Sequence, residues 1–261
     1  MATDIPQQYV PTVSESEALL PEFCPNVDHV ITEDDTPLDN IFSEKQQRLL
    51  TEALYATWKP AVPFLVMANV GLFYAINLPP FVPDVLLSLD VEAPANLFPK
   101  SHRSYFVWEY GKPPNVVVEV VSNREGKEDT DKLKGYARIG VNFYIIYDPE
   151  QKLSSERLRF FELRGGDFQL LDSASPKMPQ VGLGATIWTG SFEGHVDQWL
   201  RWTNLDGELI ATGAERASIE RERAESERQR ADLATSMMED ANRRAEKMAE
   251  QLRRLGISPE A

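Results

Sequence analysis

Residues 116–121 read Val-Val-Val-Glu-Val-Val, and this stretch decides the fold that the rest of the sequence has to fit. β-Branched side chains favour a pleated, covered surface, so the run predicts a strand that is buried on both faces. Glu119 stands in the middle of it. A carboxylate there loses hydration, which is costly unless a cation or hydrogen-bond donors compensate. The stretch therefore predicts a buried acid that has a partner.

A second carboxylate, Asp84, starts the apolar segment at residues 83–87, Pro-Asp-Val-Leu-Leu. If the two strands pair, cross-strand neighbours lie about 5 Å apart, so Asp84 and Glu119 can meet. A divalent ion between them would relieve the repulsion of two buried anions and lower the pKa of a bound water. Oxygen ligands of this kind suit Mg²⁺ or Mn²⁺ better than zinc.

A lysine downstream completes the candidate site. Lys132 lies on a predicted helix, one turn before Tyr136 and beside the apolar stripe that Leu133 and Tyr136 form. Its side chain can therefore reach back over the end of the sheet. Lys134 points about 200° around the same helix and is expected to face water.

Each of these residues also has a structural interpretation, which the sequence leaves open. Glu119 can be a buried acid bonded to backbone or to an arginine. Asp84 can be a turn residue after proline, and Lys132 can be a solvated surface lysine. The three histidines are scattered along the chain, which argues against a zinc site and against a Ser-His triad.

Composition narrows the class of protein. The chain has 261 residues, of which 42% are hydrophobic, enough for a sizeable core. Its net charge of -14 argues against tight nucleic-acid binding, but residues 1–42 alone carry nine acidic residues and no Lys or Arg. A single cysteine, Cys24, excludes an internal disulfide framework and fits a reducing compartment. Without a visible signal peptide or an apolar run of about 20 residues, we expect a cytoplasmic protein with no membrane partner.

We divide the chain into an acidic, loosely ordered arm at residues 1–42, a folded core at 43–205, a linker at 206–212 and a charged helix at 213–256. The core is expected to be an α/β fold in which helices flank a mixed sheet. Its predicted elements are a helix at 43–58 that opens with a Ser43–Gln46 capping box, strands at 63–68, 71–77, 84–89, 116–121 and 142–147, a helix at 127–138, and a hairpin of 157–163 with 167–171. Residues 105–110 are expected to form a loop or edge strand, Ile187 and Trp188 a short strand, and Trp199 with Trp202 a closing helix.

The C-terminal helix carries a heptad pattern. Apolar residues recur at every seventh position from Ala217 to Leu252, and the complementary position is apolar only after residue 231. This predicts a coiled coil, with a homodimer through residues 231–255. A lone charged helix that i,i+4 ion pairs stabilise is the alternative.

These motifs together resemble a known family. The series Pro-Asp (83–84), P-x-x-V-V-E-V-V-S (114–122), D-K-x-x-x-Y-x-x-x-G-V (131–141) and F-Y-I-I-Y-D-P (143–149) is similar to the Uma family of endonucleases. That family belongs to the restriction-endonuclease-like superfamily, named for its PD-(D/E)XK motif. The resemblance spans about residues 43–171 and leaves out the arm and the heptad helix.

By this resemblance, Asp84 and Glu119 are metal ligands, and the carbonyl of Val120 is a further one. The superfamily's lysine belongs two residues after the second acid, where this chain has Val121. The Uma pattern places a lysine on the following helix instead, and here that residue is Lys132. The first helix of many superfamily members supplies another acid, for which Glu44 and Glu52 are both available.

The resemblance implies a Mg²⁺- or Mn²⁺-dependent endonuclease that hydrolyses phosphodiester bonds of double-stranded DNA, with Asp84, Glu119 and Lys132 as catalytic residues. A non-catalytic scaffold that binds a protein partner through its coiled coil is the main alternative, and Val121 and the acidic balance favour it. A third hypothesis is a protein that binds single-stranded or branched DNA and stacks bases on the aromatic residues of 105–110.

Overall fold

The computed structural model describes residues 25–27, 40–123, 127–171 and 176–256. The acidic arm expected at residues 1–42 lies outside the described residues except for 25–27 and 40–42. The chain separates into two units, residues 1–212 and residues 213–261, and each is described by itself. None of the described helices is both long enough and apolar enough to cross a membrane.

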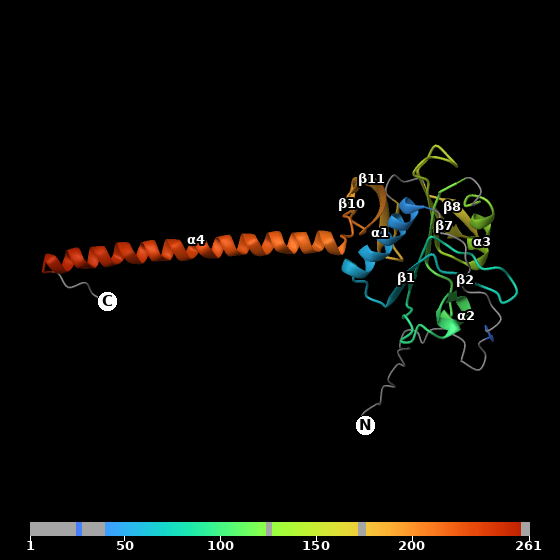
Figure 1. The fold of residues 1–261 in the computed structure, drawn as a ribbon, viewed down its shortest axis with the longest axis horizontal. Coiled ribbons are helices and arrows are strands. Elements are labelled where there is room, and N and C mark those ends of the chain that lie inside the picture. Colours follow the sequence, from blue (N-terminus) through green and yellow to red (C-terminus); the bar gives the residue numbers. More distant parts are fainter. Residues whose placement is uncertain (1–24, 28–39, 124–126, 172–175, 257–261) are drawn as a thin grey trace, which may run out of the picture. The chain divides into compact units, whose positions relative to one another are not determined.

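The first unit holds most of the secondary structure (Figure 1). Its helices are α1 (Ile41–Thr57), the 3-10 helix η2 (Lys100–His102), α2 (Val107–Tyr110) and α3 (Asp131–Ile139). Its strands are β1 (Phe64–Ala68), β2 (Leu72–Phe73), β3 (Val85–Leu89), β4 (Tyr105–Phe106), β5 (Val116–Val120), β6 (Phe143–Tyr147), β7 (Leu158–Arg164), β8 (Asp167–Leu170), β9 (Lys177–Met178), β10 (Leu183–Phe192) and β11 (His195–Thr203).

Six of these strands form one mixed sheet in the order β1-β3-β5-β6-β7-β8. β5 and β6 run parallel, and α3 forms the crossover that parallel neighbours need. The other neighbours in this sheet are antiparallel. A second sheet has the order β11-β10-β9, and β2 pairs with β4. The mixed α/β fold expected from the sequence is confirmed.

The valines of β5 pack against two layers, as a strand buried on both faces requires. Val116, Val118 and Val120 belong to the layer that also contains residues of α1 and of the second sheet. Val117 and Val121 belong to the opposite layer, which includes Tyr136 of α3. In Figure 1, α1 and the β10–β11 hairpin accordingly lie on one side of the central sheet, and α3 lies on the other.

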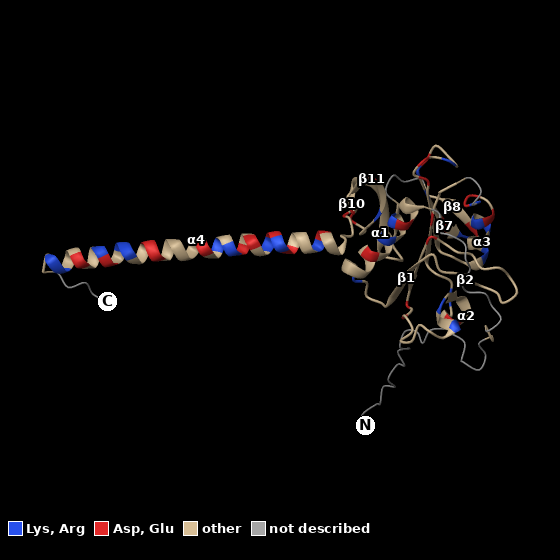
Figure 2. Ribbon diagram, viewed as in Figure 1, with Lys and Arg blue, Asp and Glu red and all other residues tan. Residues whose placement is uncertain are grey.

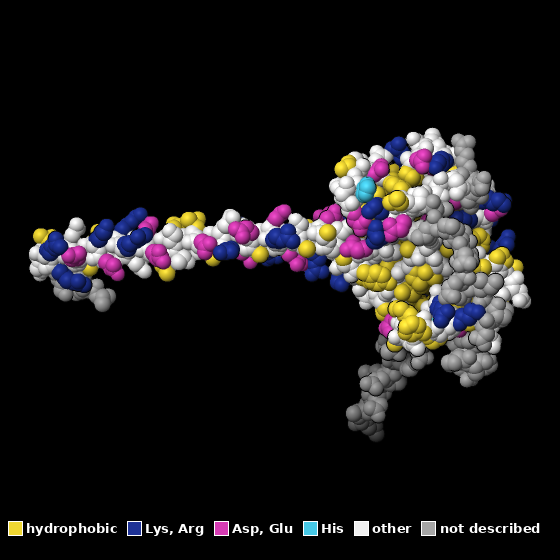
Figure 3. Space-filling view, in the orientation of Figure 1, with side chains coloured by type: hydrophobic (Ala, Val, Ile, Leu, Met, Phe, Trp, Pro, Cys, Tyr) yellow, Lys and Arg dark blue, Asp and Glu magenta, His cyan; other side chains and the backbone are white. Residues whose placement is uncertain are grey.

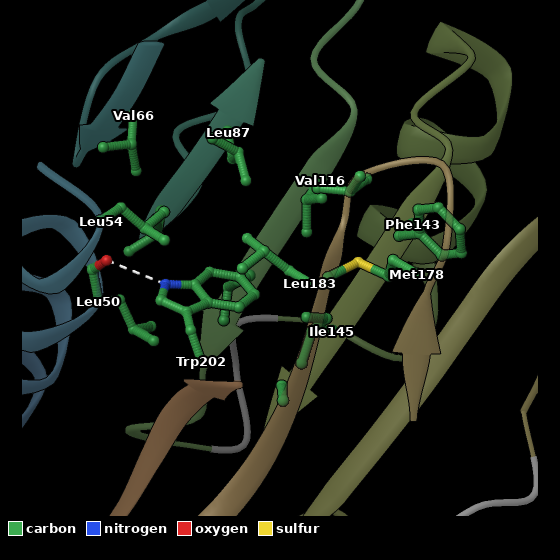
Figure 4. Packing of buried hydrophobic residues seen from close by; sticks show 14 of the residues in the cluster. Leu50, Leu54, Val66, Leu87, Val116, Phe143, Ile145, Met178, Leu183 and Trp202 are labelled. Atoms are coloured by element: carbon green, nitrogen blue, oxygen red, sulfur yellow. Dashed lines mark hydrogen bonds between the residues drawn. The ribbon is translucent and has the colours of Figure 1, made fainter. Parts of the chain in front are cut away.

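Trp202 of β11 anchors the first of these layers (Figure 4). Its ring is buried between the second sheet and α1, and its Nε1–H donates a hydrogen bond of 2.9 Å to the carbonyl oxygen of Leu50. Burial of an indole of this size is worth on the order of 4 kcal/mol. The contact therefore ties α1 to the second sheet, and α1 is one of the elements that border the candidate site.

The expectation that Trp199 and Trp202 form a closing helix is wrong, because both lie on β11. Their three-residue spacing fits one face of a helix, but β11 pairs with β10 over nine residues. The end of β11 is covered on both faces: Trp202 enters the core layer, and the guanidinium of Arg201 lies 4.9 Å from the centre of the Trp188 ring. Two-sided burial removes the alternation by which a strand is recognised.

Three other boundaries also differ from the prediction. α1 begins at Ile41, because the side chain of Asn40 caps it by accepting a hydrogen bond of 2.9 Å from the Ser43 amide. The capping box expected at Ser43 is therefore wrong. Of residues 71–77 only Leu72–Phe73 forms a strand, and residues 105–110 form β4 followed by the single turn α2.

The second unit is described as one helix, α4 (Gly213–Arg254), and none of its described side chains is buried. Basic and acidic residues alternate along it (Figure 2), and small hydrophobic patches lie between them (Figure 3). Its i,i+4 ion pairs, such as Arg216–Glu220 at 2.8 Å, are exposed and contribute about 0.3–0.5 kcal/mol each. Self-association through residues 231–255 stays a prediction.

Candidate metal centre

The strand register brings Asp84 and Glu119 together. β3 and β5 are antiparallel, and Val85 pairs with Val118 at the end of their ladder. The next residue on each strand is Asp84 or Glu119, so the two acids stand opposite each other where the ladder ends. Both side chains are buried, with exposed fractions of 8% for Asp84 and 1% for Glu119. The site therefore lies at the ends of two inner strands of the sheet and is largely shielded from solvent.

Two donors hold the Asp84 carboxylate. Its Oδ2 accepts a hydrogen bond of 2.7 Å from the backbone amide of Val120. Its Oδ1 accepts one of 2.5 Å from Nε2 of Gln47, which lies on the buried face of α1. The backbone pairing of β5 with β3 ends at Val118. Just beyond that end, the Asp84 side chain accepts the hydrogen bond of the Val120 amide. The carboxylate thus completes the strand pairing and is oriented by it.

Two residues of α3 hold the Glu119 carboxylate. Nζ of Lys132 lies 2.8 Å from Oε2, and the hydroxyl of Tyr136 donates a hydrogen bond of 2.6 Å to Oε1. Lys132 also pairs with Glu128 at 3.6 Å. Because residues four apart share one face of a helix, Lys132 and Tyr136 reach the same carboxylate. Lys132 is therefore a cationic partner of the kind that the sequence predicts for a carboxylate buried at this position.

The placement of Tyr136 depends on a glycine. The Phe81 ring packs 4.9 Å from the Tyr136 ring, measured between centroids. A Cβ on Gly135 would lie 2.2 Å from Cζ of Phe81, so only glycine lets the two elements approach this closely. The segment just before Asp84 and the helix that holds Glu119 are therefore packed against each other at the site.

Burial dominates the electrostatics of the two acids. It raises the pKa of Glu119 to about 8, against the opposing effect of Lys132 and with a further increase from Asp84. Burial also raises the pKa of Asp84, although the Val120 amide, Lys132, Gln47 and a hydrogen bond with the Glu119 side chain oppose it. Two neighbouring carboxyls that both resist ionisation form a site at which a bound cation would favour the charged forms.

The pKa values of Lys132 and Tyr136, the two residues that bond to Glu119, both depend on the charge of that carboxylate. Burial lowers the pKa of Lys132, but the charge and hydrogen bond of Glu119 outweigh it, so the pKa is raised. Burial and the negative charge of Glu119 raise the pKa of Tyr136 well above its usual range. Lys132 therefore stays charged, and Tyr136 stays a hydrogen-bond donor, over the whole physiological pH range.

The donor set fits a hard divalent cation. Mg²⁺ is commonly held by one or two carboxylates and completes its shell with water or substrate oxygens. Asp84 and Glu119 meet that requirement. Among the residues that the structure describes, no group of three or more His, Cys, Asp or Glu side chains is arranged to hold a metal ion.

The position at which the superfamily has its lysine is held by a buried valine. Val121 is buried in the layer under α3, where a lysine would place its charge in the core. Lys132 occupies the position beside Glu119 instead. Glu44 of α1 pairs with Arg48 at 3.0 Å, and the contact that α1 makes with Asp84 comes from Gln47. A role for Glu44 or Glu52 stays a prediction.

Gln47 is a site residue that the sequence did not predict. Its signal was present, because Gln46 and Gln47 share the face of α1 that Leu50 and Leu54 bury. Two amides on the apolar face of an amphipathic helix indicate buried hydrogen bonds. Gln46 uses both ends of its amide on the backbone of Leu200, at 2.9 Å each. Gln47 instead donates its hydrogen bond to the Asp84 carboxylate.

Of the aromatic residues of 105–110, two are buried and two, Trp108 and Tyr110, are partly exposed, so stacking of bases on this segment stays a prediction. Tyr105 and Phe106 are buried, and the Tyr105 hydroxyl is bonded to Ser88 at 2.9 Å. Lys100 and His102 lie on η2, where His102 borders a cavity of about 470 Å³ that is also lined by Asp90 and Glu109. That cavity adjoins the other end of β3, about 20 Å along the strand from Asp84.

Comparison with known proteins agrees with this geometry. The model of the Uma2 family, which is described as a putative restriction endonuclease, matches residues 30–182, more than half of the chain. The matched range includes Asp84, Glu119 and Lys132. A search of curated proteins finds no match.

Proposed function

We propose that this chain, which belongs to the Uma2 family of restriction-endonuclease-like proteins, is an endonuclease that depends on a divalent metal ion and hydrolyses phosphodiester bonds in double-stranded DNA. One observation carries the proposal: two buried carboxyls face each other at a strand end, and a lysine lies 2.8 Å from one of them. The family supports nuclease chemistry, and the donor set supports Mg²⁺ or Mn²⁺.

In this proposal Asp84, Glu119 and the carbonyl oxygen of Val120 hold the ion. When bound, the ion would lower the pKa of a water and neutralise charge that builds up on the scissile phosphate. Gln47 and the Val120 amide hold Asp84 in place, and Tyr136 does the same for Glu119.

Lys132 has two roles in this proposal. In the metal-free protein its ammonium lies 2.8 Å from the Glu119 carboxyl and favours the ionised form of that group. With substrate bound, the same ammonium donates to a non-bridging oxygen of the phosphate and stabilises the pentavalent transition state. Because Lys132 sits on α3 and not on β5, it can move by changes in its own side-chain torsions, and the strand stays in register.

Plasmid cleavage tests the proposal. Purified protein is incubated with supercoiled plasmid and Mg²⁺ or Mn²⁺, beside Glu119→Gln, Lys132→Met and the matched control Lys134→Met, whose residue is exposed on the same helix. We expect the first two variants to lose nicking by at least about a hundredfold and the control to retain it. Equal nicking by wild type and Glu119→Gln, or no nicking by wild type with either metal, would refute the assignment.

A homodimer through residues 231–255 belongs to the same proposal. The exposed heptad residues Met238, Met248 and Leu255 support it, because pairing would cover them. Two copies joined in this way would carry two sites, one for each strand of a duplex. Sedimentation of the full chain at several concentrations distinguishes this dimer from a lone helix.

The second candidate function is a non-catalytic scaffold that binds a protein partner through α4. The buried Val121 in place of the superfamily's lysine favours it, as does the acidic balance of the chain. Calorimetry separates the two functions. A nuclease binds Mn²⁺ at a site that Asp84→Ala abolishes, whereas a scaffold shows no such site.

A further inference from the structure

The loop between β2 and β3 borders the candidate metal centre. It comprises residues 74–82, and its two ends are joined by an antiparallel bridge in which Leu72 and Phe81 exchange backbone hydrogen bonds of 2.7 and 3.2 Å. Phe81 then packs on Tyr136, and Tyr136 bonds to Glu119. The chain continues directly from the loop into Asp84, so the base of the 74–82 loop is fixed to both acids of the site.

The loop carries apolar side chains into solvent. Ile76, Leu78 and Val82 are 39%, 49% and 47% exposed. No charged residue occurs anywhere between Lys59 and Asp84. In Figure 2 this uncharged chain contrasts with the blue Lys and Arg residues of α3. Isolated exposed apolar residues are ordinary, but three within one short loop beside a polar site form a surface of their own.

The acidic excess of the folded core bears on how the apolar 74–82 loop could contribute to DNA binding. Residues 43–212 contain 21 Asp and Glu against 17 Lys and Arg. A protein of this balance gains little affinity from phosphate contacts. An uncharged loop does not repel DNA and offers side chains that contact bases. Ile, Leu and Pro side chains are the kind that proteins insert between base steps.

We propose that the 74–82 loop is an apolar wedge that contacts the bases next to the scissile phosphate and unstacks that step. The proposal rests on the proposed nuclease function for the identity of the substrate. It assigns to Ile76 and Leu78 the contact with the bases and to Asp84, Glu119 and Lys132 the contact with the phosphate. The loop would then contact the bases of a DNA step, and the metal centre would contact the phosphate of that step.

Unstacking can be measured without cleavage. A duplex with 2-aminopurine at its centre is titrated with the full chain in the absence of Mg²⁺ and Mn²⁺, so the DNA stays intact. Wild type is compared with the double variant Ile76→Ser/Leu78→Ser and with the control Val196→Ser, whose residue is 75% exposed on β11. We expect wild type and control to raise the fluorescence, and the double variant to lose that rise and bind the duplex about tenfold more weakly.

Plasmid nicking in Mn²⁺, run in parallel, separates this inference from the proposed function. If wild type cleaves but the fluorescence does not rise, or rises equally with the double variant, the wedge is wrong and the nuclease stands. If the rise occurs and depends on Ile76 and Leu78 but no cleavage is found, the nuclease is wrong and the wedge stands. If neither fluorescence nor cleavage responds, both are wrong.

Discussion

Replacement of Glu119 by glutamine is expected to change how the stability of the metal-free protein depends on pH. In the folded chain the pKa of this carboxyl is raised to about 8 from an ordinary value of 4.5. Between these two values the folded state holds a proton on Glu119 that the unfolded state has released. The free energy of unfolding of wild type should therefore fall as the pH rises through this window.

The size of the effect follows from one proton. Each pH unit within the window should lower the free energy of unfolding of wild type by up to about 1.4 kcal/mol relative to Glu119→Gln, which has no proton to lose at this position. The free energy of unfolding of Glu119→Gln should therefore rise relative to that of wild type from pH 5 to pH 8, and the difference should level off above pH 8. The value of about 8 already includes the lowering by Lys132, which sets the upper end of the window and not the slope within it.

Urea unfolding in EDTA at pH 5, 6, 7 and 8 measures this difference, with Glu156→Gln as a control for the removal of one exposed surface carboxylate. Added Mn²⁺ should then stabilise wild type and Glu156→Gln but not Glu119→Gln, because the ion needs both carboxylates of the site. A difference that stays constant from pH 5 to pH 8 would show that Glu119 is already ionised at the lower pH, and the assignment of a strongly raised pKa would be wrong.

Three further predictions concern packing and organisation. Gly135→Ala should destabilise the protein by about 1–3 kcal/mol in urea unfolding and reduce metal affinity in calorimetry, because its Cβ displaces Phe81; an unchanged midpoint would contradict the close approach. Trp202→Phe should cost about 2 kcal/mol, since it removes the bond to Leu50 and part of the ring, and a loss below about 0.5 kcal/mol would show that the anchor is unimportant. A chain that ends at Thr212 should keep the circular dichroism of its sheets and sediment as a monomer, and a dimer of this shorter chain would place the contact outside α4.

The residues of the candidate site could be predicted because their immediate neighbours in the sequence distinguish them. An acid within a run of valines is unusual enough to mark Glu119 from the sequence alone, and Asp84 follows from the apolar strand that it precedes. The expected strand pairing was confirmed, and it sets the two carboxyls opposite each other. The choice of Lys132 over Lys134 needed only helical geometry, and the structure places Lys132 at the carboxylate.

What could not be predicted depends on contacts between distant segments. Gln47 reaches Asp84 only because α1 packs on the central sheet beside Trp202, a residue about 150 positions away in the chain. β11 carries apolar residues on both faces near its end, so no alternation distinguishes it from a helix. The short β2 likewise depends on its pairing with β4, which follows much later in the chain.

The bond between Asp84 and the Val120 amide makes the proposed chemistry depend on the register of two strands. Strand side chains alternate between faces, so a slip of one residue between β3 and β5 would turn Glu119 away from α3 and separate the acids. A nascent or misregistered chain then lacks the pair, and a protein that cuts DNA would gain that ability only at the last step of its assembly. Quality control of this kind needs no inhibitor, because the correct alignment is itself the safeguard.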